Sequence, residues 1–154
     1  KLVECFSVLD NIILGVEPTK GLFLEKKNAR AKVMELSEKY GLMVDPDALI
    51  SDITVGMQQR TEILKMLYRD NEVLIFDEPT KGVDVKAKTD LFQLIDGLAR
   101  EGKGVIYASG EFAELVGLCD RICVLWDGRI VAEIAGAEAR EETLLYYSTG
   151  GTAS

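Results

Sequence analysis

The fold of this chain is decided by residues 73–80, Val73-Leu74-Ile75-Phe76-Asp77-Glu78-Pro79-Thr80. Four apolar residues run directly into two adjacent carboxylates and a proline, a pattern typical of a fully buried strand that ends at a turn. Open α/β sheets bind their ligands at the carboxyl ends of their strands. We therefore expect Asp77 and Glu78 at a ligand-binding edge.

The two neighbouring carboxylates repel each other, and the packing of a strand gains nothing from them. A bound cation relieves the repulsion, and the cation that most often meets such a pair is Mg²⁺ carried by a nucleotide. The stretch therefore predicts a Walker B strand. An exposed Asp-Glu pair in an ordinary turn is the alternative.

Composition indicates a globular protein with one sizeable core. The chain has 154 residues, of which 47% are hydrophobic and 29% charged, with a net charge of −8. The acidic balance and the lack of a long basic run argue against a nucleic-acid or anionic-membrane surface. The three cysteines, Cys5, Cys119 and Cys123, lie in apolar contexts and predict buried, reduced thiols. Without a histidine or a second cysteine pair, no zinc site is expected.

The chain carries no apolar stretch near the ~18 residues that span a bilayer and no signal peptide. It begins at Lys1, directly in apolar sequence. We therefore expect an N-terminally truncated piece of a longer protein.

The apolar spacing predicts helices and strands that alternate after a helical first part. We expect helices over 8–15, 26–40, 56–69, 85–100, 111–117 and 137–147, and strands over 73–76, 105–108, 121–126 and 129–134. Asp127-Gly128 predicts a tight hairpin. The fold class is therefore α/β, with a parallel sheet and flanking helices preceded by a mainly helical subdomain.

Two other stretches could carry chemistry. Thr54 and Gly56 stand at the start of a predicted helix, where free backbone N–H groups and the helix dipole can bind an anion; a simple N-cap is the alternative. Gly82-Val83-Asp84 follows the Asp-Glu strand as a tight loop. A glycine turn with Asp84 as an N-cap explains this loop equally well.

The ordered set of motifs resembles the ATPases of ABC transporters. Thr54-Val55-Gly56-Met57-Gln58 is similar to a divergent form of the family signature, Ser-Gly-Gly-Gln, Val73–Glu78 resembles Walker B, and Gly82–Asp84 resembles the D-loop. The resemblance implies a partial P-loop NTPase cassette. Residues 1–70 would form its helical and signature subdomain, and residues 71–154 its Walker B and C-terminal α/β part.

The resemblance also implies a role for each matching residue. Asp77 would hold Mg²⁺, and Glu78 would be the catalytic general base for the attacking water. Thr54 and the amide of Gly56, with the rest of the signature (Val55, Met57 and Gln58), would bind ATP held by an opposing cassette. Asp84 would link the two halves of that dimer.

Two parts of the family pattern have no match in these residues. The nearest approach to a P-loop, Gly97 to Gly104, follows a helix rather than a strand and has glycine at the hydroxyl position. We interpret Gly102 as a helix cap and Lys103 as a solvated charge. Gly110 stands where the family has its switch histidine. We therefore expect ATP and Mg²⁺ to bind only in a complex that supplies a P-loop, and no ATPase activity from the chain alone.

Within the family, the sequence resembles the two-cassette ATPases of bacterial sugar and nucleoside importers. Residues 1–80 resemble a first cassette and the part from Gly82 onward a second, so a junction at Thr80 is one hypothesis. The implied partners are the permease transmembrane subunits and a second ATPase cassette or another copy, with no nucleic acid. The implied location is cytoplasmic, peripheral at the inner face of the cell membrane. The alternatives are a non-catalytic fragment that docks on the permease through residues near 1–25 or on a partner cassette, and a non-functional remnant.

Overall fold

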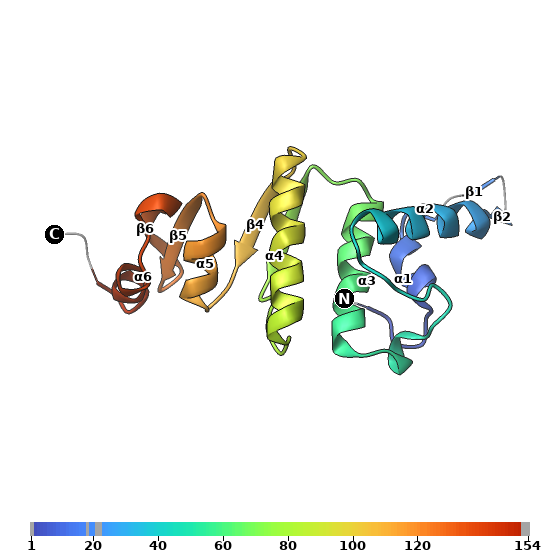
Figure 1. The fold of residues 1–154 in the computed structure, drawn as a ribbon, viewed down its shortest axis with the longest axis horizontal. Helices are drawn as coiled ribbons and strands as arrows, with labels where there is room; N and C mark the ends of the chain where they lie inside the picture. The colour runs from blue at the N-terminus through green and yellow to red at the C-terminus, as the bar shows by residue number, and fades with distance from the viewer. Residues whose placement is uncertain (1, 18, 21–22, 152–154) are drawn as a thin grey trace.

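The computed structural model describes residues 2–17, 19–20 and 23–151, and its elements lie in a row (Figure 1). The first part comprises α1 (Val8–Ile13), β1 (Thr19–Lys20), β2 (Phe23–Leu24), α2 (Lys26–Lys39), η1 (Ile50–Asp52) and α3 (Val55–Tyr68). The second comprises β3 (Val73–Asp77), α4 (Val85–Arg100), β4 (Gly104–Ala108), α5 (Phe112–Leu118), β5 (Arg121–Trp126), β6 (Arg129–Ala135), η2 (Gly136–Glu138) and α6 (Glu141–Ser148). The predicted α/β class with a helical first part is confirmed.

Helix α1 begins where Ser7 accepts a hydrogen bond from the amide of Asp10 at 3.1 Å. Its polar residue Asn11 is fully buried but is satisfied, because its amide group exchanges hydrogen bonds with the backbone of Val3 and donates to the carbonyl of Ser7. Buried polar groups are tolerated when they are paired in this way. The contact anchors Val3 on α1, which packs against α3.

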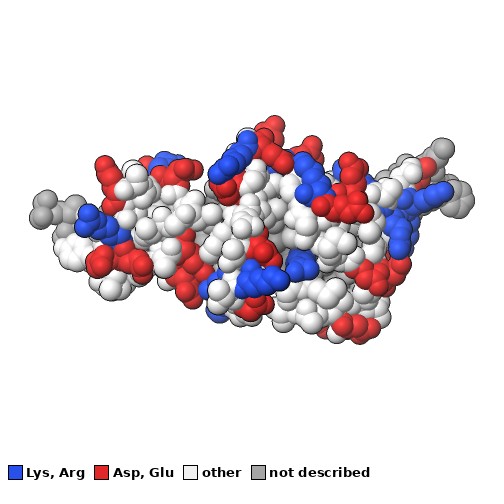
Figure 2. All heavy atoms as spheres, viewed as in Figure 1, with Lys and Arg blue, Asp and Glu red and all other residues white. Residues whose placement is uncertain are grey.

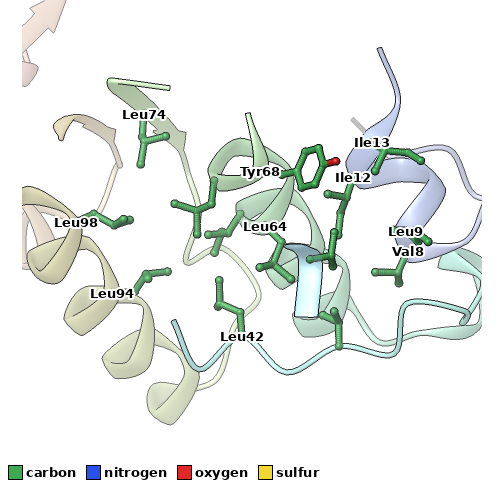
Figure 3. Packing of buried hydrophobic residues seen from close by; sticks show 14 of the residues in the cluster. Val8, Leu9, Ile12, Ile13, Leu42, Leu64, Tyr68, Leu74, Leu94 and Leu98 are labelled. Carbon is green, nitrogen blue, oxygen red and sulfur yellow. The ribbon is translucent and has the colours of Figure 1, made fainter. Parts of the chain in front are cut away.

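The larger hydrophobic cluster joins the helical part to the sheet. Figure 3 shows Val8 and Ile12 of α1, Leu64 of α3, Leu74 of β3 and Leu98 of α4 in one cluster of buried side chains. The predicted division of the chain at residues 70/71 stays a prediction, and this cluster contains residues from both sides of it.

Strands β3 and β4 pair in parallel, from Val73 opposite Gly104 to Asp77 opposite Ala108. The prediction of a fully buried strand was wrong. Leu74 and Phe76 are buried, whereas Val73 and Ile75 are 54% and 61% exposed. Side chains alternate between the two faces of a strand, and helices cover only one face of this two-stranded sheet. The hydrophobic run alone could not indicate that difference.

The C-terminal part has its own smaller cluster, formed by Ile122, Val124, Ala139 and Leu144. Strands β5 and β6 form the predicted antiparallel hairpin, with positive φ at the turn residues Asp127 and Gly128. The single helix predicted over 137–147 was wrong, because the chain forms η2 and then α6. Extended backbone at Ala139 and Arg140 separates the two helices, and buried Ala139 packs in the cluster at this break.

The prediction that the cysteines are buried was wrong for two of the three. Cys5 and Cys123 are exposed and Cys119 is partly buried, all with free thiols. Cys123 alternates with buried Ile122 and Val124 along β5, so it lies on the uncovered face of the hairpin. Among the described helices, none is both long and apolar enough to cross a membrane.

Candidate active site

Asp77 and Glu78 lie at the carboxyl end of the parallel strands, as the sequence predicted. Asp77 is the last residue of β3, opposite Ala108, and both carboxylates are exposed. The amide of Glu78 donates to the carbonyl of Ala108 at 2.9 Å, so pairing with β4 continues for one more residue. Glu78 then takes φ of +47°, in the left-handed region that residues other than glycine seldom adopt. The chain turns sharply at this glutamate.

The carboxylate of Glu78 accepts a hydrogen bond from the amide of Gly110 at 2.9 Å. Gly110 is the residue at the expected switch position, and its contact with Glu78 is made by the backbone amide. A Cβ at Gly110 would lie 3.5 Å from the same carboxylate oxygen, an ordinary contact. Glu78 and Gly110 also line a cavity of about 460 Å³, together with Thr80, Lys81, Gly82, Val83, Lys88 and Glu111. Glu78 therefore faces a hollow, with its carboxylate held from one side.

Glu114, a residue that sequence reasoning missed, lies directly behind this hollow. Its carboxylate is buried and accepts four hydrogen bonds, from the Lys88 ammonium and from the hydroxyls of Thr80, Tyr107 and Ser109. Its one signal in the sequence is a charged residue within the apolar stretch Phe112–Leu118. The four donors come from distant parts of the chain, so the local pattern could not identify them.

The charge state of this network follows from its contacts. Burial raises the pKa of the Glu114 carboxyl, but the ammonium and the three hydroxyls outweigh it, and the pKa lies below its usual value. The hydrogen bond to Glu114 raises the pKa of Lys88. Burial, followed by the hydrogen bond to Glu114, raises the pKa of the Tyr107 phenol. At neutral pH the network therefore contains an ionised carboxylate, an ammonium and neutral hydroxyls.

The predicted signature residues lie at the start of α3. The Thr54 hydroxyl caps the helix by accepting from the amide of Met57 at 3.4 Å, and Val55 is 66% exposed. The first amides of a helix have no partner within it, so this end can still receive an anion. The side-chain amide of Gln58 donates to the carbonyl of Ile50 at 3.1 Å. Gln58 thus joins α3 to the preceding turn.

Thr54, Gly56 and Met57 share a hollow of about 710 Å³ with Asp84, between α3 and α4. Asp84 is the N-cap of α4, and its carboxylate accepts from the amide of Ala87 at 3.0 Å. The structure therefore brings these signature residues and Asp84 together, whereas Glu78 lines the other hollow. The loop Pro79–Val83 joins the two sites.

The residues are compatible with Mg²⁺ only as part of a larger site. Within the described ranges, no group of three or more His, Cys, Asp or Glu side chains could hold a metal ion. Mg²⁺ usually keeps several waters and binds one or two carboxylates plus the phosphates of a nucleotide. Exposed Asp77, at the end of β3 and next to Glu78, fits that limited role.

Residues 97–104, the nearest approach to a P-loop, form the C-terminal end of α4 and the turn into β4. Gly102 follows α4 with φ of +88°, and the amide of Lys103 donates back to the carbonyl of Leu98. Lys103 is not the solvated charge that we predicted, because its side chain is 18% exposed and its ammonium contacts Asp70 and the carbonyl of Asn71, each at 3.0 Å.

The charged side chains on the face drawn in Figure 2 mix both signs, with lysine and arginine interspersed among aspartate and glutamate and a pale area across the middle. This mixed pattern does not form a continuous basic stripe on that face, which is the usual electrostatic footprint of nucleic-acid binding.

Comparison with known proteins finds similarity along the whole chain. The ABC transporter family matches residues 2–81. Nucleoside import ATP-binding protein NupA of Lactococcus lactis is 44% identical over 153 residues, which are 99% of this chain and 30% of that protein. Ribose import ATP-binding protein RbsA 3 of Rubrobacter xylanophilus is 38% identical over 149 residues, 97% of this chain and 30% of the relative. The chain thus spans about 30% of the length of these curated relatives.

Solved structures share the fold at lower identity. The dimeric ATP-binding cassette MJ0796 bound to ADP and Pi has a TM-score of 0.74 and 20% identity, and the match covers 90% of this chain and 60% of that one. The cbiO1 subunit of Clostridium perfringens has a TM-score of 0.70 and 21% identity over 97% of this chain and 57% of that one.

Proposed function

This chain belongs to the ABC transporter family, and we propose that it is part of the ATPase subunit of a bacterial importer for sugars or nucleosides. The names of its relatives, which are nucleoside and ribose import ATP-binding proteins, support that solute class. The observation that carries the catalytic part is Glu78, exposed at the strand end beside a cavity and held there by the amide of Gly110.

The proposed chemistry divides between the two hollows. At the strand end, Asp77 would hold Mg²⁺ and Glu78 would accept the proton of the attacking water. Bound MgATP would supply the phosphoryl group and the charge that the P-loop of a cassette stabilises. At the start of α3, Thr54 and the amide of Gly56 would contact ATP held by an opposing cassette, and Asp84 would contact that partner.

The roles of Asp77 and Glu78 in hydrolysis need a P-loop, which no stretch of residues 1–154 matches. P-loop amides and lysine supply most of the phosphate binding, so we expect no turnover by the chain alone. A second cassette or another copy, and permease transmembrane subunits at the inner face of the cell membrane, are the proposed partners.

The test supplies a P-loop on a separate chain. A segment of NupA that carries a P-loop would be added to this chain, and phosphate release would be measured with MgATP. We expect turnover only in the mixture, and a Glu78→Gln chain should lower it by about 10²-fold or more, because a general base contributes on that scale. Glu133→Gln is the matched control, since Glu133 is an exposed carboxylate on the remote hairpin.

Equal turnover with Glu78 and Gln at this position would refute the general-base role. A Gly56→Asp chain tests the signature separately: it should lower turnover in a dimer with a complete cassette, because a carboxylate at the start of α3 would repel phosphate.

A docking role without turnover is the second candidate. Gly110, at the position where the family has its switch histidine, favours it. Part of the proposed docking segment near 1–25 lies outside the described residues. Co-purification with the permease subunits, together with no turnover in any mixture, would favour this alternative.

A further inference from the structure

Two loops meet at the ends of β3 and β4, and one carboxylate from α5 contacts both. We propose that Glu114 is a positioning residue that holds Glu78 in place by fixing the loops on either side of it. This inference rests on the proposed role of Glu78, and it concerns how the chain keeps that side chain in its hollow.

Both carboxylate oxygens of Glu114 accept hydrogen bonds, four in all. Oε2 accepts from the hydroxyls of Thr80 and Tyr107, both at 2.8 Å, and of Ser109 at 3.0 Å. Oε1 accepts from the Lys88 ammonium at 2.9 Å. An ionised carboxylate is an acceptor only, with about four lone-pair sites. A glutamine of the same shape would present two donors and could not satisfy this set.

The first connection runs through Thr80, two residues after Glu78. Thr80 is 2% exposed, so its hydroxyl has little access to water other than through Glu114. The carbonyl of Thr80 also accepts from the amide of Val83, and the carbonyl of Glu78 accepts from the amide of Lys81. A left-handed conformation at a residue such as Glu78 persists only when the surroundings impose it. The hydrogen bond from Thr80 to Glu114 fixes the turn at residues 78–83, and this turn holds Glu78 in its left-handed conformation.

The second connection runs through Ser109. Its hydroxyl donates to Glu114 and accepts from the amide of Glu111 at 3.0 Å, so the loop is fixed before and after Gly110. The amide of Gly110 then donates to the Glu78 carboxylate. Ser109 therefore carries the influence of Glu114 to the backbone group that contacts Glu78.

Lys88 extends the same network to α4, one turn beyond its N-cap Asp84. Glu114 thereby links the two hydrophobic clusters. Its partners Lys88 and Tyr107 lie on α4 and β4, which contribute residues to the larger cluster, whereas other residues of its own helix, α5, pack on the smaller one. The carboxylate joins the hydrolytic edge to the helix whose N-terminus bears the proposed dimer contact.

The experiment measures the hydrogen bond between Gly110 and Glu78 directly. In the full 154-residue chain at one neutral pH, hydrogen exchange of the Gly110 amide, followed by NMR, should be slower than in an unfolded peptide, because that amide donates to the Glu78 carboxylate. Glu78→Ala removes the acceptor and should abolish this protection. In Glu114→Gln we expect the protection factor of the Gly110 amide to fall by about twofold or more, because coupled polar networks lose more than one contact when a member is removed. Glu133→Gln, the same change at a remote carboxylate, should leave the protection factor unchanged.

Ser109→Ala is the milder second variant, and it should also lower the protection of the Gly110 amide, even if Glu114→Gln does not fold. Full protection in a folded Glu114→Gln chain, or in Ser109→Ala, would overturn the positioning role. Protection that persists in Glu78→Ala would also overturn it, because Glu78 would then not be the partner. None of these results depends on ATP hydrolysis, so a failure of Glu78 as a general base would be recognised separately in the turnover assay.

Discussion

The hydrogen bond between Thr80 and Glu114 allows a quantitative test of the network behind Glu78. Its length is 2.8 Å, and both residues are buried, at 2% and 8% exposed. We consider Thr80→Val, which keeps the shape of the side chain but removes the hydroxyl, Glu114→Gln, and the double variant.

The expected magnitude follows from the partner's charge. A hydrogen bond to a charged group contributes about 1.5–3 kcal/mol to stability. Because Glu114 keeps its other donors in Thr80→Val, we expect the lower end, a loss of about 1.5 kcal/mol. Glu114→Gln should cost about 3 kcal/mol, since it disturbs several contacts and leaves the Thr80 donor without its acceptor. The double variant should lose less than the sum, with a coupling energy of about 1 kcal/mol.

The assay is urea unfolding followed by far-UV circular dichroism. With an m-value of about 2 kcal/mol/M, the Thr80→Val midpoint should fall by about 0.75 M. Thr89→Val is the matched control, because the Thr89 hydroxyl donates to the carbonyl of Val85 on the exposed side of α4. We expect that control to change stability by less than about 0.5 kcal/mol.

Strict additivity of Thr80→Val and Glu114→Gln would refute the reasoning, because it would mean that the two side chains do not interact in solution. A Thr80→Val chain as stable as the control would refute it equally.

The remaining predictions concern pH, thiol reactivity and the core. The folded-state pKa of Glu114 lies below its usual value. The ionised carboxylate therefore stabilises the folded chain above the unfolded pKa, about 4.3, and this contribution is lost as the pH falls through the folded pKa. Urea midpoints should consequently fall less on acidification in Glu114→Gln than in the parent. Exposed Cys5 should react with a thiol reagent faster than Cys119, whose pKa is raised by burial and then by the charge of Asp120; equal rates would contradict this. Leu64→Ala should cost about 2–5 kcal/mol because Leu64 is fully buried, whereas Leu125→Ala, at a site 64% exposed, should cost less than about 0.5 kcal/mol in the same urea assay.

The sequence predicted the elements whose signals are local. The bounds of α4, Val85–Arg100, are confirmed, because Asp84 caps its start and Gly102 follows its end with positive φ. The bounds of β5 and the hairpin turn at Asp127 are confirmed for the same reason. Caps and turn residues act within a few positions of themselves, so a single sequence contains all the information they need.

Local signals failed over residues 137–147, where the sequence predicted one helix and the structure has two short ones, η2 and α6. The helical pattern over 137–147 continued through Ala139 and Arg140, yet the backbone there is extended. Buried Ala139 packs in the smaller cluster. Tertiary packing overrode a weak local preference, as it commonly does for helix propensity.

By itself, the sequence determined the family, the position of Asp77 and Glu78 at a strand end, and the N-caps Thr54 and Asp84, because each depends on residue types at short, fixed spacings. Only the tertiary structure decided which face of β3 is covered, that Gln58 bonds to Ile50, and that Glu114 gathers four donors. Those donors come from the loop after β3, from α4, from β4 and from the loop that follows β4. Contacts between elements far apart in the chain depend on packing in three dimensions, which a linear pattern of residue types does not encode directly.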